Sequence, residues 1–255
     1  MTAALTLDDP SPYFARLDEF EDRHWWPKTL RRVAFGALKS ALGRRTGLTA
    51  LDVGCGTGRN LKALEALGSI ETVLGIEPEG QALRRADRPN LIRGSALNLP
   101  IATGLIDVLL CCDVLQHLPP GGDSLALAEF ARVLRPNGVL LVRANAGGET
   151  GYRLSHLVEI VRSAGFRVEW ASHVNVLPAL AQEMRGRLAK GLRLSQSIAA
   201  SHPSGGGLPA ASRSGWGSRL MGCVAALEAE AMVRLRLTSP FGHSTLIVAR
   251  RTHSP

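Results

Sequence analysis

The chain has 255 residues, of which 45% are hydrophobic, so it can bury a sizeable core and is not an intrinsically disordered protein. No apolar run reaches the roughly 18 residues of a membrane-spanning helix, and the start, MTAALTLDDPSP, lacks the features of a secretory signal, so we expect a cytoplasmic protein without a transmembrane segment. The net charge of +8 is uneven, because residues 1–150 carry 17 basic and 17 acidic residues and residues 151–255 carry 13 and 5.

The first elements along the chain are predicted to be helical. Residues 10–22 indicate a polar helical lead-in. From residue 29 onward, Leu30, Val33, Leu38 and Leu42 recur at helical spacing, and Gly43 is a suitable stop. We treat residues 1–46 as an N-terminal lead-in that can cover a binding site.

Short apolar segments then alternate with helical ones. Strands are predicted at 48–54, 72–77, 90–95, 105–114, 137–145, 167–174 and 244–251, and helices at 60–67, 79–87, 125–134 and 152–166. This alternation predicts an α/β fold with a doubly wound, Rossmann-like sheet of seven mainly parallel strands. The core domain would comprise residues 47–174 and 241–255.

About 70 residues separate the last two predicted strands, so residues 175–240 are predicted to form a helical insert. A Gly/Ser/Pro-rich linker at 200–217 divides it. Each half carries one apolar stripe; these are Leu177, Leu180, Met184, Leu188 and Leu192, and then Leu220, Val224, Leu227, Ala231 and Leu235. The insert is expected to cover an acceptor site or to form a homodimer contact.

Basic residues cluster within the first half of this insert, at Arg185, Arg187, Lys190 and Arg193. Three interpretations stay open for the segment 185–193: a solvated face of a soluble cap, an attraction for an anionic or carrier-linked acceptor, and a contact with an acidic membrane surface. The apolar stripe has no aromatic residue, which disfavours membrane insertion.

The segment LDVGCGTG, at 51–58, places glycines at alternate positions behind a predicted strand. Such a turn into a helix N-terminus binds nucleotide-like ligands in open α/β sheets. The dinucleotide fingerprint G-x-G-x-x-G would need a third glycine where this chain has Arg59, whereas Gly58 comes one residue early. Glu77 ends the next strand and can accept both hydroxyls of a ribose, which either class of ligand carries.

Four segments together resemble class I S-adenosylmethionine-dependent methyltransferases. LDVGCGTG is similar to the family's acidic-x-G-x-G-x-G turn, and VLGIEPEG is similar to its ribose-binding segment. GSALNLPIATGLIDVLLCCDVLQHL resembles the adenine loop and fourth strand, and ARVLRPNGVLLV resembles the helix, turn and strand that follow. The match covers roughly residues 47–145. The ends, HWW at 24–26 and SPFGHSTLIVARR at 239–251, resemble a bacterial subgroup that acts on small molecules or saccharides.

The resemblance implies S-adenosylmethionine as cofactor and S-adenosylhomocysteine as product. The glycines would approach the methionine part, Asp52 would order the turn or meet the amino group, and Glu77 would bind the ribose. Ser95 and Ala96 would flank the adenine. The full set of implied cofactor-binding residues is Asp52, Gly54, Gly56, Gly58, Glu77, Pro78, Ser95, Ala96, Cys112 and Asp113.

Two positions depart from the family's pattern. Ser95 stands where aspartate is common, so the exocyclic amine of the adenine loses a charged acceptor. Asn137 stands where glycine is usual, but asparagine tolerates left-handed backbone angles better than most residues.

His117 and Asp113 are the candidate catalytic residues, because both follow the fourth strand near the expected position of the methyl group. The alternative for His117 is a packing or hydrogen-bonding role within its loop, and for Asp113 a helix cap. Trp25 and Trp26 either cover the cofactor or anchor a helix. Lys28 and Arg31 either meet the cofactor's carboxylate or lie on a solvated helix face.

Metal chemistry is not expected, because Cys55, Cys111, Cys112 and Cys223 form no CxxC pair and are interpreted as free thiols. The favoured function is methyl transfer to a small metabolite, natural-product intermediate or saccharide, on oxygen rather than nitrogen. A nucleic-acid acceptor is disfavoured, since no aromatic residues interleave the basic ones. The alternatives are a nicotinamide-dependent oxidoreductase and a non-catalytic cofactor-binding protein.

Overall fold

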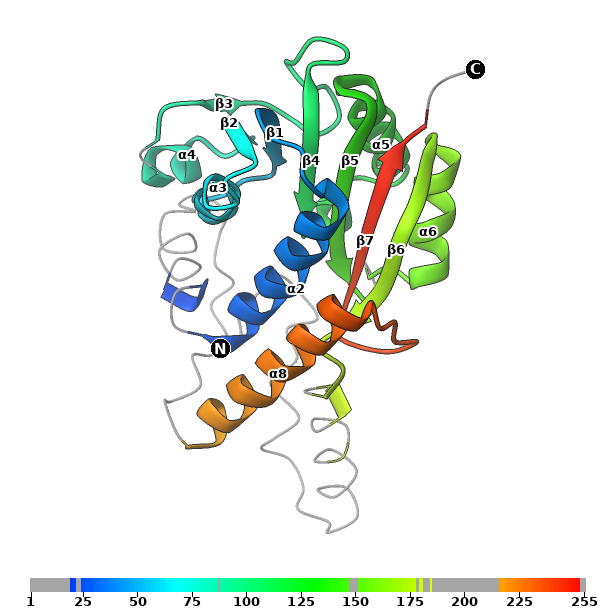
Figure 1. Cartoon of the computed structure of the whole chain (residues 1–255). Coiled ribbons are helices and arrows are strands. Elements are labelled where there is room, and N and C mark those ends of the chain that lie inside the picture. Colours follow the sequence, from blue (N-terminus) through cyan, green and yellow to red (C-terminus); the bar gives the residue numbers. More distant parts are fainter. Residues whose placement is uncertain are drawn as a thin grey trace, which may run out of the picture.

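The structure is a computed structural model, and it describes residues 19–21, 24–86, 88–146, 151–177, 179–180, 184 and 216–252. Seven strands form one sheet in the order β3-β2-β1-β4-β5-β7-β6 (Figure 1). The strands are β1 (Leu48–Val53), β2 (Ile70–Glu77), β3 (Leu91–Arg93), β4 (Ile106–Cys112), β5 (Leu134–Asn145), β6 (Phe166–Val174) and β7 (Ser244–Arg251). Strand β7 pairs antiparallel with β5 and β6, and the other pairs are parallel. The predicted fold class is confirmed.

Helices cover both faces of the sheet. They are α2 (Trp25–Leu42), α3 (Arg59–Glu65), α4 (Gly80–Ala86), the short 3-10 helix η1 (Leu115–His117), α5 (Gly122–Val133), α6 (Leu154–Ser163) and α8 (Trp216–Leu235). One hydrophobic core joins α5 and α6 to the sheet, and a second joins α2, α3 and α8 to the opposite face. None of the described helices is long and apolar enough to cross a membrane.

Helix α2 follows its predicted pattern. Leu30, Val33, Leu38 and Leu42 are all buried against the second core. The helix ends at Gly43, whose φ of 61° is a backbone conformation that glycine adopts without strain. The N-terminal part of the chain therefore shares a core with the sheet.

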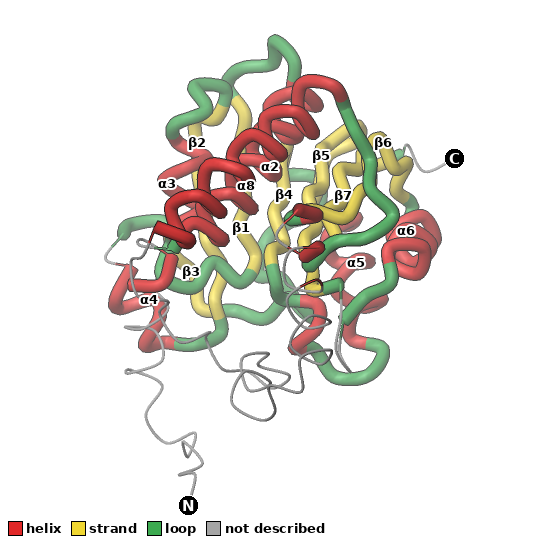
Figure 2. Tube along the Cα trace, turned by 90° about the horizontal axis from the view of Figure 1, so that it is seen from below, coloured by secondary structure: helices red, strands yellow, loops and turns green. Residues whose placement is uncertain are grey.

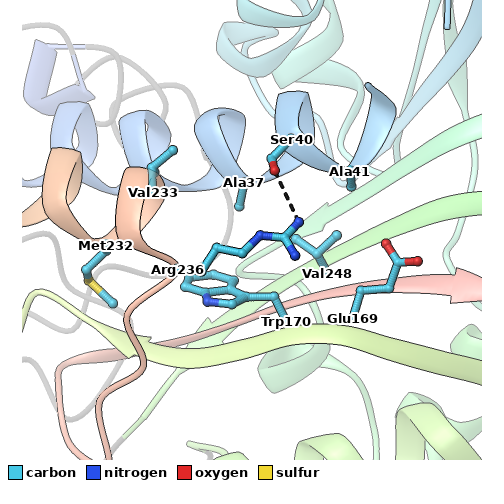
Figure 3. A pocket seen from close by; sticks show the side chains of 9 residues that line it. All are labelled: Ala37, Ser40, Ala41, Glu169, Trp170, Met232, Val233, Arg236 and Val248. Carbon is cyan, nitrogen blue, oxygen red and sulfur yellow. Dashed lines mark hydrogen bonds between the residues drawn. The ribbon is translucent and has the colours of Figure 1, made fainter. Parts of the chain in front are cut away.

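Helix α8 packs along α2, and both views show the two helices side by side (Figures 1 and 2). Glycines mark the closest approaches. A Cβ atom on Gly36 would lie 2.7 Å from Cγ2 of Val233, and one on Gly222 would lie 3.2 Å from Cβ of Trp25. Contact positions advance in the same direction along both helices, so α2 and α8 run parallel.

The apolar stripe marked in the sequence of α8 is not the side that packs. Leu220, Leu227 and Leu235 are 65%, 73% and 68% exposed, whereas Ala225 and Ala229 are fully buried. Where α8 comes closest to α2, one of the two helices carries a glycine, at Gly36 and at Gly222, because a Cβ there would crowd the partner helix. In the first half of the insert, the leucines at 177 and 180 and the methionine at 184 are also exposed, and the basic segment 185–193 lies outside the described residues.

Phe130 on α5 is fully buried in the first core, and its replacement tests how much that core contributes to stability. We expect Phe130→Ala to lower the free energy of unfolding by about 3–5 kcal/mol through lost burial and the resulting cavity. The matched control on the same helix is Leu125→Ala, because Leu125 is 61% exposed and should cost within about 0.5 kcal/mol. Equilibrium denaturation in urea measures both values, and equal losses would contradict the packing.

Candidate active site

The predicted site residues lie where the parallel strands end. Figure 2 views the molecule from below Figure 1, toward this carboxyl edge of the sheet. Leu51 and Val53 pack in the core under α5 and α6. Because side chains alternate along a strand, Asp52 points to the face that α2 covers. Cys112 contacts the core on that same face.

The turn after β1 has the backbone geometry that only glycine adopts easily. Gly54, Gly56 and Gly58 have φ angles of 74°, 52° and 82°. A Cβ atom on Gly54 would lie 2.2 Å from Cγ2 of Val114, so the turn approaches the loop after β4 too closely for any side chain. A Cβ on Gly56 would meet no atom within 4 Å, which leaves its backbone open for a ligand.

Glu77 is held in place by backbone N–H groups. The N–H of Gly56 donates to its Oε2 at 2.9 Å, and the N–H of Glu79 donates to its Oε1 at 3.1 Å. The residue is only 7% exposed, and burial raises the pKa of its carboxyl group, which the two backbone hydrogen bonds partly oppose. This carboxylate links the end of β2 to the glycine turn, with further lone pairs to accept hydroxyl groups.

Asp52 is fully buried, and neither of its carboxylate oxygens makes a well-formed hydrogen bond. Burial raises its pKa to about 7, although the Asn60 side chain lies close enough to lower it in part. A buried acid without a strong partner is costly, and such groups cluster at functional sites. The observation fits a ligand that brings a cation or hydrogen-bond donors to this position.

Asp113 and Arg143 form an ion pair across the ends of β4 and β5, in which the arginine is buried and the aspartate side chain is 38% exposed. Both carboxylate oxygens of Asp113 accept from the Arg143 guanidinium, whose side chain is 11% exposed. Burial by itself would lower the pKa of Arg143, but the Asp113 carboxylate raises it above its ordinary value. Asp113 has a left-handed φ of 60°, and its N–H donates to the Arg143 carbonyl at 2.8 Å. Its carboxylate is therefore committed to this arginine.

Cys112 directly precedes Asp113, and its thiol is shielded from water. Burial raises the pKa of its thiol to about 12, and the nearby Arg143 offsets only part of this. The thiol is therefore neutral at ordinary pH.

The predicted adenine loop follows β3. The Ser95 hydroxyl accepts from the N–H of Leu97 at 3.2 Å, which closes a short turn, and Ala96 is buried beside it. Glu129 on α5 accepts from the N–H of Leu99 at 2.8 Å and so fixes the far end of the loop. Pro78 is exposed and follows Glu77, where its carbonyl accepts from Arg93 at 3.1 Å.

His117 is exposed to solvent, whereas the two tryptophans at the start of α2 pack against other side chains. His117 ends η1 and is exposed. Trp26 contacts the second core, and its ring centroid lies 4.8 Å from that of His243. Trp25 contacts Gly222 on α8. The two tryptophans therefore anchor the start of α2, as one of the two interpretations expected.

The structure adds Arg143 and Glu21 to the site, which the sequence did not single out, and it decides between the two interpretations of Arg31. Arg143 pairs with Asp113. Arg31 is only 19% exposed beside Glu21, so the solvated-face interpretation is wrong for Arg31, whereas Lys28 is exposed. The signal available for Arg143 was a charged residue within an otherwise apolar strand. Nothing in the sequence placed Glu21 near this site.

These residues fit the cofactor that the sequence resemblance implies. Three features lie together at one edge of the sheet. They are the glycine turn, which has no room for a side chain at Gly54, the poorly paired Asp52, and Glu77, which is held by backbone N–H groups. They would meet the methionine backbone, the amino group and the ribose respectively. Among the described residues, no group of His, Cys, Asp and Glu could hold a metal ion.

Comparison with known proteins agrees with this geometry. Residues 51–142 match a family described as a methyltransferase domain. The chain is 36% identical over 138 residues to a putative 23S rRNA (guanine-N(1)-)-methyltransferase of Micromonospora griseorubida, which covers 51% of this chain and 41% of that protein. It is 33% identical over 125 residues to a malonyl-[acyl-carrier protein] O-methyltransferase of Pectobacterium atrosepticum, which covers 47% of each. The aligned part thus spans less than half the length of both relatives.

Solved structures share the fold over nearly the whole chain. A chain from the complex between the Haloferax volcanii Trm112 methyltransferase activator and a putative methyltransferase superposes with a TM-score of 0.58 and 20% sequence identity. The superposition covers 97% of this chain and 98% of the other. Strand order, glycine turn and family match agree with one another: residues 51–142 match a methyltransferase domain, and the match supports S-adenosylmethionine as the cofactor.

Proposed function

We propose that the protein transfers a methyl group from S-adenosylmethionine to an oxygen of a small-molecule or carrier-linked acceptor. The observation that carries the methyl-transfer part is the arrangement of Asp52 and Glu77 around the glycine turn. Bound S-adenosylmethionine supplies a methyl group already activated on a sulfonium centre. The protein's task is then to position an acceptor in line with the carbon–sulfur bond and to exclude water.

The proposed cofactor contacts divide by chemistry. Asp52 receives the ammonium group, Glu77 binds the ribose hydroxyls, and the glycine backbone lies along the methionine chain. Ser95 and Ala96 border the adenine. Pro78 follows the ribose contact, while Cys112 and Asp113 lie toward the sulfur.

The acceptor side is proposed from the end of β4 onward. His117 is exposed in the loop after this strand and is the candidate base for an alcohol acceptor. Asp113 is the weaker candidate, because Arg143 engages both of its oxygens; its proposed role is to hold Arg143 beside the site. Support for oxygen as the target comes from the malonyl-[acyl-carrier protein] O-methyltransferase among the relatives.

The segment 175–240 is proposed to cover the acceptor. Glu228 on α8 supports this, because its carboxylate accepts from the N–H groups of Val176 and Leu177 at 2.6 and 2.9 Å and so joins the two ends of the insert. The excess of basic residues after residue 150 suits an anionic or carrier-linked acceptor. A homodimer through the outward leucines of α8 is the other use proposed for this segment.

Calorimetric titration with S-adenosylhomocysteine and with NAD tests the cofactor class. We expect micromolar binding of S-adenosylhomocysteine and none of NAD, and the reverse result would favour an oxidoreductase.

A panel of hydroxylated metabolites, acyl carriers and ribosomal RNA, incubated with radiolabelled methyl donor, tests the acceptor. Label in ribosomal RNA alone would overturn the small-molecule proposal, and binding without any turnover would favour a non-catalytic role.

Glu77→Gln tests the ribose contact. We expect it to weaken binding of S-adenosylhomocysteine by about 1–3 kcal/mol, because charge-assisted hydrogen bonds are lost. Glu79→Gln is the matched control, since Glu79 is exposed two residues later, and its affinity should stay at the wild-type value. Thermal unfolding shows whether both variants fold. Undiminished affinity in Glu77→Gln would remove this residue from the cofactor site.

The pKa of about 7 at Asp52 predicts a pH dependence of binding. A cationic amino group binds the ionised carboxylate, so affinity for S-adenosylhomocysteine should rise roughly 25-fold between pH 5.5 and pH 7.5. Asp52→Asn should show a nearly flat profile. Calorimetry across this range checks both proteins, and parallel profiles would contradict the proposed contact.

The same raised pKa has a consequence for the ligand-free protein. Between about pH 4 and pH 7 the folded state holds a proton on Asp52 that the unfolded state has lost, so stability should fall as pH rises. Asp52→Asn should lack this fall. Urea denaturation at several pH values measures it, and identical slopes in the two proteins would contradict the buried acid.

A further inference from the structure

A carboxylate of the chain itself lies between two arginines beside the glycine turn. Oε2 of Glu21 is 3.7 Å from Nη1 of Arg31 and 3.9 Å from Nε of Arg59. Arg31 also donates to the Glu21 carbonyl at 2.9 Å. Arg59 is the first residue of α3 and directly follows Gly58. These side chains are 19–24% exposed, so the ion pairs are partly shielded from water.

The negative charge of Glu21 affects the pKa values of residues at the centre of the site. Burial is the main cause of the raised pKa values of Asp52 and Cys112, and the Glu21 carboxylate raises both further. It also contributes to the raised pKa of Arg143. Glu21 therefore lies close to residues at the ends of β1, β4 and β5, on the face where the methionine part of the cofactor is proposed to bind.

We propose that Arg31 and Arg59 bind the amino-acid carboxylate of the cofactor, and that Glu21 holds this pair of arginines when the ligand is absent. The proposal rests on the cofactor site described under the proposed function. Glu21 is then an intramolecular competitor: the ligand carboxylate takes its place between the two guanidinium groups.

Charge balance explains why the two carboxylates exclude each other. Arg143 is already neutralised by Asp113, so it offers little to a second anion. Within the described part of the chain, Arg31 and Arg59 are the cations that Glu21 contacts next to the turn, and Asp52 and Glu77 place acidic groups nearby. A ligand carboxylate beside Glu21 would add a further like charge at short distance, which is unfavourable in a partly buried site. Departure of Glu21 removes that repulsion.

The test compares two ligands that differ only in the carboxylate. S-adenosylhomocysteine has it, and S-adenosyl-3-thiopropylamine lacks it but keeps the ammonium group. We expect Glu21→Gln to bind S-adenosylhomocysteine about three- to tenfold more tightly than the wild type, as suits removal of a partly exposed intramolecular ion pair. Its affinity for the amine should not change. Glu19→Gln, an exposed neighbour, is the matched control and should bind both ligands as the wild type does.

A second pair of variants assigns the arginines. In the Glu21→Gln background, Arg31→Met or Arg59→Met should abolish the gain for S-adenosylhomocysteine and leave the amine unaffected. Glu21→Ala should repeat the result of Glu21→Gln, and thermal unfolding confirms that each variant is folded.

The outcomes separate this proposal from the proposed function. If the wild type binds neither nucleoside, the methyltransferase function itself fails. If the wild type binds both and Glu21→Gln leaves the affinity for S-adenosylhomocysteine unchanged, or tightens both ligands equally, the competition is overturned while the cofactor assignment stands. Weaker binding of both ligands in Glu21→Gln would show that Glu21 receives the ammonium group instead, which also overturns the proposal.

Discussion

The contact between the glycine turn and its surroundings is the constraint on which the site depends. Gly54 passes so close to Val114 that a single added methyl group would collide, and the N–H of Gly56 fixes Glu77 on the next strand. The ends of β1, β2 and β4 are thereby locked at one edge of the sheet. Because these bonds are made by backbone atoms with positive φ, side-chain substitution at the glycines removes the geometry itself.

Two acidic residues at this edge of the sheet have different surroundings. Asp113 is neutralised by Arg143 through a bidentate pair, whereas Asp52 lacks a strong partner and has a pKa of about 7. An ion pair holds its two side chains in a fixed geometry. A buried charge without a strong partner is unfavourable in free energy, and a ligand of opposite charge can lower that free energy. Asp113 therefore supports the geometry of the site, whereas Asp52 is left without a strong partner.

Prediction from the sequence succeeded where a pattern is local and repeated. Strand β7 coincides with the predicted 244–251, and Asn137 has the left-handed φ of 62° that its position in the turn suggested. The prediction was less useful on α8, whose leucines face outward while Ala225 and Ala229 are buried. Periodicity shows that a helix has an apolar side, but a close helix pair selects small residues for the contact, and only the partner helix reveals that.

The sequence by itself determined the alternation of strands and helices, the glycine turn and the acidic residues at Asp52 and Glu77, because these depend on neighbours within a few positions. Only the tertiary structure decided which distant charges meet there. Arg143 lies 30 residues beyond Asp113, and Arg59 follows Glu21 by 38 positions, yet both pairs form at the carboxyl edge. Such pairs arise from strand order and from the packing of α2 on the sheet, which no local spacing encodes.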